Sequence, residues 1–188
     1  MATEDHWTPP SPWCPSPSWW HADADDADAA EHEVSALVTA LIRAAQPEVV
    51  VETGTATGAT AVMIGDALKA NRHGWLWTVE VDGNAAKIAT EAVQGLPVTV
   101  ICASSLEWDP PDRIDFAWID SGIADIRVGE IRKWRSKFSS GAIVAVHDTA
   151  PNMGREALHD YLHEVLRELG WPSLSLRTPR GIMLAQVP

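Results

Sequence analysis

The sequence is organised around one stretch, Val49-Val50-Val51-Glu52-Thr53-Gly54-Thr55-Ala56-Thr57-Gly58-Ala59-Thr60. Three β-branched residues lead into an acid, two glycines stand four residues apart, and an apolar helical pattern follows at Ala61, Ile64, Gly65 and Leu68. In such a unit of strand, glycine turn and helix, a ligand can approach bare backbone at the end of the strand. The helix start also offers unpaired N–H groups to an anion. The stretch predicts a ligand site, with an ordinary strand-to-helix turn as the alternative.

Strand patterns and helix patterns alternate along the rest of the chain. Strands are expected at 49–53, 75–81, 98–103, 114–119, 142–146, 174–176 and 182–186. Helices are expected from about Asp23 to Pro47, after Gly58 to about Ala70, from Asn84 to Val93, around Val128, Ile131 and Trp134 up to Gly141, and around Leu162. This alternation predicts an α/β fold, with a mostly parallel seven-stranded sheet and helices on both faces. The short turn Pro179-Arg180-Gly181 joins only antiparallel neighbours, so the last strand should be antiparallel.

The 188 residues are expected to form one domain, residues 21–188, preceded by an arm rich in proline and tryptophan, residues 1–20. Five prolines exclude a helix or central strand in the arm. Its four tryptophans suggest docking on the domain or on a neighbouring subunit, whereas a floppy tail is the alternative for residues 1–12. Trp19, Trp20 and His21 could close over a pocket.

Composition narrows the classes of function. A net charge of −12 argues against a surface that holds nucleic acid through its phosphates. No apolar run of membrane-spanning length and no signal peptide is present, so a cytoplasmic protein without membrane contact is expected. Cys14 and Cys102 lack the spacing of a redox or metal motif, and a disulfide framework is not expected.

Acids stand at the predicted carboxyl ends of four strands, the edge at which open α/β sheets bind ligands. These residues are Glu52, Glu80, Asp120 and Asp148, and the third strand ends in Ser104-Ser105. Buried acids are costly unless they bind something. Glu80, at the end of the second strand, is placed to accept hydrogen bonds from the hydroxyls of a ribose. A dinucleotide and a P-loop nucleotide are disfavoured because neither glycine motif occurs.

Four motifs in order resemble class I S-adenosylmethionine-dependent methyltransferases, most closely the small O-methyltransferase branch that includes catechol and caffeoyl-CoA O-methyltransferases. The motifs are Glu52-Thr-Gly-Thr-Ala-Thr-Gly58, Glu80 with Asp82, Phe116-Ala-Trp-Ile-Asp120 and His147-Asp148-Thr149. The resemblance covers about residues 30–188. It implies a Rossmann-like, doubly wound fold, S-adenosyl-L-methionine as cofactor, and methyl transfer to a hydroxyl of a small-molecule acceptor. It also implies a homodimer.

The resemblance also implies roles for single residues. The cofactor would be bound by Glu52, Gly54, Thr55, Gly58, Thr60, Glu80, Val81, Ser104, Ser105 and Asp120. A divalent cation such as Mg²⁺, held by Asp120, Asp148 and Thr149, would bind the substrate hydroxyl and lower its pKa. The alternative for Asp148 is a cap on the next helix.

The catalytic residues expected from the resemblance are Asp120 and a base. In the catechol branch a lysine soon after the fourth-strand acid is the base, but this chain reads Asp120-Ser121-Gly122-Ile123. His147 and His21 are the candidate replacements, and His147 could equally be a packed strand-end residue.

Two further patterns are interpreted as structural. His159 and His163 stand one helical turn apart, but no third zinc ligand is evident, so a solvated helix face is favoured. Arg127, Arg132, Lys133, Arg135 and Lys137 are expected to form a charged outer surface.

Two other functions stay open. The first is methylation of a nitrogen, although the motif of base N-methyltransferases is absent at 147–151. The second is a non-catalytic domain that binds S-adenosylmethionine or its demethylated product.

Overall fold

A computed structural model of the chain describes residues 30–151 and 156–188. The elements are α1 (His32–Ala45), β1 (Val49–Thr53), α2 (Ala59–Asn71), β2 (Trp75–Glu80), α3 (Gly83–Ala92), β3 (Val98–Cys102), β4 (Ile114–Ile119), α4 (Ala124–Trp134), β5 (Phe138–His147), α5 (Glu156–Glu168), β6 (Ser173–Leu176) and β7 (Ile182–Gln186). The predicted arm, with Cys14, and the candidate base His21 lie outside the described residues. No described helix is both long and apolar enough to cross a membrane.

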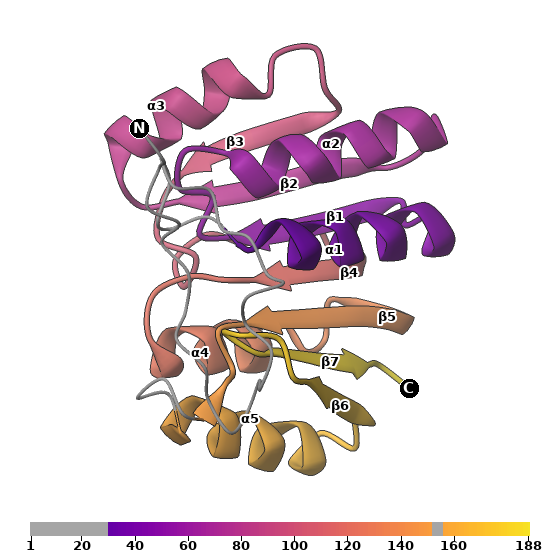
Figure 1. The fold of residues 1–188 in the computed structure, drawn as a ribbon, viewed down its shortest axis with the longest axis vertical. Coiled ribbons are helices and arrows are strands. Elements are labelled where there is room, and N and C mark those ends of the chain that lie inside the picture. The colour runs from indigo at the N-terminus through magenta and orange to yellow at the C-terminus, as the bar shows by residue number, and fades with distance from the viewer. Residues whose placement is uncertain (1–29, 152–155) are drawn as a thin grey trace, which may run out of the picture.

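The strands form one seven-stranded sheet in the order β3-β2-β1-β4-β5-β7-β6 (Figure 1). Strands β1 to β5 pair in parallel, and β7 is antiparallel to both β5 and β6. The turn Pro179-Arg180-Gly181 links β6 to β7, so the predicted antiparallel last strand is confirmed. The strand order reverses between β1 and β4, and such a switch point opens a crevice for a ligand.

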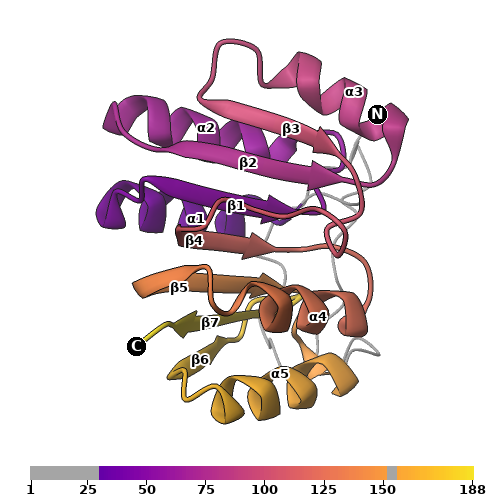
Figure 2. The same cartoon turned by 180° about the vertical axis from the view of Figure 1, so that it is seen from behind.

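Helices cover the two faces of the sheet and bury two apolar clusters. On the face in front in Figure 1, α1 and α2 pack side chains such as Val38 and Ile64 against β1, β2 and β4. On the other face, seen in Figure 2, α4 and α5 pack side chains such as Ile131 and Leu162 against β4, β5 and β7. The predicted α/β fold is therefore confirmed.

The predicted start of the first helix near Asp23 lies outside the described residues. Within them α1 begins at His32, and Glu31 before it has extended backbone (ψ 144°) and a side chain bound to His147. One element boundary differs from the sequence prediction. Strand β5 begins at Phe138 rather than Ala142, with an irregular register against β4. Gly141 has φ +83°, which lets the strand absorb this irregularity instead of ending a helix.

Candidate functional site

A pocket of about 590 Å³ lies at the carboxyl ends of the central strands. Of the residues predicted for the site, it is lined by Gly54, Glu80, Val81, Ser104, Ser105, Asp120 and Asp148. Glu52, Thr55, Gly58, Thr60, His147 and Thr149 do not line it. The remaining lining residues include Ala56, Asp82, Leu106, Ile126, Arg127 and Arg180.

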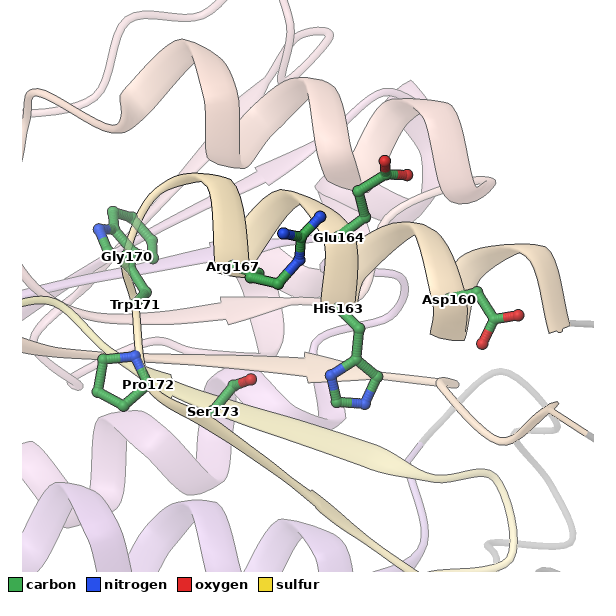
Figure 3. A pocket seen from close by; sticks show the side chains of 8 residues that line it. All are labelled: Asp160, His163, Glu164, Arg167, Gly170, Trp171, Pro172 and Ser173. Atoms are coloured by element: carbon green, nitrogen blue, oxygen red, sulfur yellow. The ribbon is translucent and has the colours of Figure 1, made fainter.

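A second, larger hollow of about 750 Å³ lies on the outside of α5 (Figure 3). Its side chains come from α5, among them His163 and Arg167, and from the connection into β6 at Trp171 and Pro172. No residue predicted for the site lines it. The pocket at the strand ends is therefore the candidate site, since it joins the predicted motifs.

The glycine turn lies against the end of β4. Gly54 has φ +78°, and a Cβ atom added to it would lie 2.6 Å from the backbone oxygen of Asp120. Its own N–H donates to the Val79 carbonyl at 3.0 Å. Gly58, with φ +97°, precedes the first turn of α2. The turn thus brings bare backbone to the pocket wall, as a cofactor cradle requires.

Glu80 holds the rim of the pocket together. One carboxylate oxygen accepts the Ala56 N–H at 2.8 Å, and the other accepts the Asp82 N–H at 2.9 Å. Asp82 in turn caps α3, because its Oδ1 accepts the N–H groups of Asn84 and Ala85 at 2.9 and 2.8 Å. A carboxylate oxygen has more than one lone pair, so Glu80 can still accept from a ligand hydroxyl.

Glu52 lies behind the pocket wall rather than in it. Its side chain is buried and accepts a hydrogen bond from the Thr78 hydroxyl at 2.6 Å. Burial, and then the charges of Asp120 and Glu80, raise the pKa of Glu52 to about 8, although the Thr78 hydrogen bond opposes the rise. Glu52 is therefore a protonated, neutral carboxylic acid at neutral pH.

Replacing Glu52 with glutamine should flatten the pH dependence of stability. The folded state keeps a proton on Glu52 up to about pH 8, whereas the unfolded chain loses it near the ordinary value of 4.5, so the native protein loses stability as pH rises between these values. Between pH 6 and pH 8 the native chain should lose about 2 kcal/mol more unfolding free energy than Glu52→Gln. Denaturant titrations at both pH values measure this difference. Glu48 is exposed, so Glu48→Gln is the control. If the unfolding free energy changed equally with pH in all three proteins, burial would not raise the pKa of Glu52.

An ion cluster closes one end of the pocket. Arg127, from α4, places Nη2 3.2 Å from Asp120 Oδ1 and 3.3 Å from Asp148 Oδ2. Its Nη1 and Nε donate to the carbonyls of His147 and Ser121 at 2.5 and 2.6 Å. Arg127 is only 4% exposed, so the prediction that it belongs to a charged outer surface is wrong.

Arg180 and Glu31 complete the cluster from distant parts of the chain. Arg180, in the turn between β6 and β7, donates from Nε to Asp148 Oδ1 at 2.7 Å and from Nη2 to Oδ2 at 3.2 Å. The Arg180 backbone N–H donates to Glu31 Oε1 at 3.1 Å. Burial raises the pKa of Asp148, but the charges of His147, Arg180 and Arg127 outweigh it and hold that pKa well below its usual range.

His147 lies between two carboxylates. Its Nδ1 is 3.1 Å from Asp120 Oδ2, its Nε2 is 2.8 Å from Glu31 Oε2, and the ring has no exposed surface. Burial lowers the pKa of His147, but the charge and hydrogen bond of Asp120 and the hydrogen bond of Glu31 outweigh it and raise the pKa to about 9. A buried imidazolium that already carries its proton does not suit the role of general base proposed from the sequence. The alternative of a packed strand-end residue describes its position.

The predicted metal ligands are only partly brought together. Asp120, His147 and Asp148 form the one group of three or more metal-capable side chains within the described residues, with ligand atoms within 4.8 Å of one another. Thr149 is buried, does not line the pocket, and its hydroxyl has no hydrogen-bond partner. The oxygens of both acids already face cationic donors of Arg127, His147 and Arg180. A divalent cation bound to these oxygens would be repelled by the three neighbouring cations, so the donor set does not fit a metal.

Sequence reasoning missed Glu31, Arg127 and Arg180. The sequence does contain a signal that Arg127 is buried, because it stands four and seven residues before Ile131 and Trp134, on the apolar face of the predicted helix. No sequence pattern indicates that Glu31 or Arg180 belongs to the site. On α5, the ring centroids of His159 and His163 lie 4.6 Å apart, in an edge-to-face contact.

Comparison with known proteins places this architecture in a family. Residues 51–149, more than half of the chain, match the model of a methyltransferase domain family. The chain therefore belongs to this methyltransferase family, and the resemblance drawn from the four motifs is confirmed at that level. A search of curated proteins finds no match.

Several solved methyltransferases share this fold. A Podospora anserina methyltransferase bound to S-adenosylhomocysteine aligns with a TM-score of 0.74 at 14% identity, over 88% of this chain and 82% of that one. TomG, an O-methyltransferase of tomaymycin synthesis from Streptomyces achromogenes solved with S-adenosylmethionine, aligns with a TM-score of 0.69 at 20% identity, over 85% and 81%. A Bacillus cereus O-methyltransferase bound to S-adenosylhomocysteine gives 0.68 at 15% identity, over 87% and 84%.

Proposed function

We propose that this protein is an S-adenosylmethionine-dependent methyltransferase that acts on a hydroxyl oxygen of a small molecule. One observation supports this most directly: a single pocket joins the glycine turn, the rim acid Glu80 and the ion cluster around Asp120. The pocket volume of about 590 Å³ suits a nucleoside cofactor and a small acceptor, not a polymer. Family membership and the O-methyltransferases among the structural neighbours support the same choice.

The cofactor would occupy the half of the pocket between the glycine turn and β2. Gly54 would let the cofactor approach the backbone, and Glu80 would accept from the ribose hydroxyls. Ser104 and Ser105, after β3, would border the adenine. Glu52, Thr55, Gly58 and Thr60 would act from behind the wall by fixing the turn. When bound, S-adenosylmethionine supplies the methyl group, which the acceptor oxygen takes as the carbon–sulfur bond breaks and sulfur keeps the bonding electrons.

The acceptor would enter beside Asp120, in the half of the pocket bordered by Ile126, Leu106 and Arg180. The apolar side chains would exclude water from the reacting atoms, and the charged end would orient the hydroxyl. Much of the acceleration would come from positioning, since the oxygen and the methyl group must meet in line.

Replacing Glu80 with alanine should weaken cofactor binding by roughly 1–3 kcal/mol, because charge-assisted hydrogen bonds to the ribose and the tie to Ala56 are both lost. Isothermal titration calorimetry with S-adenosylhomocysteine measures the change. Asp82→Asn is the matched control, since asparagine keeps the cap on α3 and alters the charge of the same wall. Unchanged affinity in Glu80→Ala would remove the ribose assignment.

The function itself is tested by incubating the pure protein with S-adenosylmethionine labelled in its methyl group. The acceptor panel pairs phenols and catechols with the matching anilines. Label on the hydroxyl compounds alone supports the proposal, and label on the amines alone would make the protein an N-methyltransferase. Calorimetric binding without transfer to either set would favour the non-catalytic binding domain.

We also propose that two copies of the chain associate and that residues 21–188 act as one domain. An apolar groove lies along Leu41, Ile143, Leu174 and Leu184, and Leu174 is 52% exposed. Among the described helices, α1 and α2 lie over β1, β2 and β4 and leave the outer strands β6 and β7 open on that face (Figure 1). A second copy would cover this apolar surface, and light scattering measures the assembly.

A further inference from the structure

We infer that the acceptor end of this pocket works without a divalent metal, and that the Arg180 guanidinium is the group that holds an acidic or ionised acceptor oxygen. The inference rests on the proposed function, since it assigns the acceptor class of that site. It starts from three acids and three bases that five segments bring together: Glu31, Asp120, Asp148, Arg127, His147 and Arg180.

Each carboxylate of the cluster faces at least one cationic side chain of the cluster. Asp120 faces Arg127 through Oδ1 and His147 through Oδ2, at 3.2 and 3.1 Å. Asp148 faces Arg180 through both oxygens and Arg127 through Oδ2. A hard cation needs several oxygens that are directed at one point and not engaged by other cations. Here the oxygens that would ligate it are directed at two guanidinium groups and at the His147 ring, so fixed protein cations stand where a metal would otherwise be needed.

The two arginines have different positions. Arg127 is 4% exposed. Its N–H groups donate to the carbonyls of Ser121 and His147 and face two carboxylates, so it stabilises the cluster. Both arginines line the pocket, but the Arg180 side chain is the more exposed, at 17%. Its planar guanidinium is held by two bonds to Asp148, so its orientation is fixed before any acceptor arrives.

A fixed guanidinium favours a particular acceptor. It stabilises an anionic oxygen through charge and directed N–H groups, but it cannot take a proton. The chain also lacks the lysine that related enzymes place after the fourth-strand acid. An acceptor that ionises readily in water, such as an acidic phenol, an enol or a carboxylic acid, needs neither a metal nor a protein base, and its proton goes to solvent. Alcohols and weakly acidic phenols should be poor acceptors.

Manganese titration followed by electron paramagnetic resonance tests the metal half of the inference, because it needs no turnover. The native protein should leave the free Mn²⁺ signal unchanged, and Arg180→Met, which removes two of the three guanidinium contacts that the described residues make to Asp148, should take up Mn²⁺ at one saturable site. Arg177→Met is the matched control, since it removes an exposed arginine from the same connection between β6 and β7. Saturable Mn²⁺ uptake by the native protein, abolished in Asp120→Asn, would overturn the inference.

Turnover tests the acceptor half. A metal that polarises the acceptor supplies several kcal/mol, so chelation would then slow transfer by more than about a hundredfold. We expect EDTA to leave the rate unchanged, and Arg180→Lys to retain more activity on an ionised acceptor than Arg180→Met does. Stimulation by Mg²⁺ would overturn the inference and leave the proposed function intact. Absence of transfer to any acceptor, with native protein that still ignores Mn²⁺, would defeat the proposed function alone.

Discussion

Arg127→Met should lower the free energy of unfolding by about 3–5 kcal/mol, because its removal leaves the three largely buried carboxylates of the cluster with two cations, His147 and Arg180. Arg127 contacts both Asp120 and Asp148 through one nitrogen, at 3.2 and 3.3 Å, and so holds the two carboxylates together. Methionine keeps much of the volume of the side chain, so the loss is electrostatic rather than a cavity. Urea titration monitored by circular dichroism measures the change.

The same helix provides the control for this variant. Arg132 also lies on α4, but its side chain is 47% exposed and its ion pair with Glu168 is on the surface. Arg132→Met should therefore change stability by less than about 1 kcal/mol. If both variants lost the same small amount, the cluster would not stabilise the strand ends. Asp148→Asn should then be similarly mild, which would confirm that conclusion independently.

Gly54→Ala should cost about 3 kcal/mol of stability and remove measurable cofactor binding. A left-handed backbone costs a non-glycine residue about 1–2 kcal/mol. At Gly54 the new Cβ would also lie 2.6 Å from the Asp120 backbone oxygen, a clash that adds about 1–3 kcal/mol by forcing β1 and β4 apart. Calorimetry with S-adenosylhomocysteine and denaturant titration report the two losses separately.

A substitution at Gly95 separates the cost of the left-handed backbone from the cost of the clash. It has the same φ of +78°, but a Cβ atom there would have no heavy atom within 4 Å. Gly95→Ala should therefore show the backbone cost alone and keep full cofactor affinity. Equal losses in the two variants would mean that the close approach of the glycine turn to β4 has no importance of its own.

Much of the fold could be predicted because its signals are local. The β-branched run of β1 and the turn at 179–181 each have a pattern that only one structure satisfies, and both appear as expected. The start of α1 at His32 could not be predicted, because several acids before it suit a helix start equally well. The residue before the helix, Glu31, has extended backbone, and its side chain is bound to a histidine 116 residues away, which no local pattern reveals.

The part of the site formed by the strand ends could be predicted from the sequence. The side chains that pair with those residues from distant parts of the chain could not. Gly54, Glu80 and Asp120 share one pocket because parallel strands place their carboxyl ends at one edge. Glu52 follows the same rule but points behind the wall, since its neighbour Thr78 accommodates it there. Arg180 reaches Asp148 across 32 residues only because β7 pairs with β5, which no local pattern reveals.

Glu31 has a consequence for anyone who re-engineers this enzyme. It directly precedes α1, and both of its carboxylate oxygens are engaged, by His147 and by the Arg180 backbone. A foreign leader grafted ahead of α1 would have to preserve an acid at this junction, or be introduced together with a neutral replacement for the histidine. The residue that precedes α1 and the ion cluster at the methyl-transfer pocket are thus coupled through one side chain.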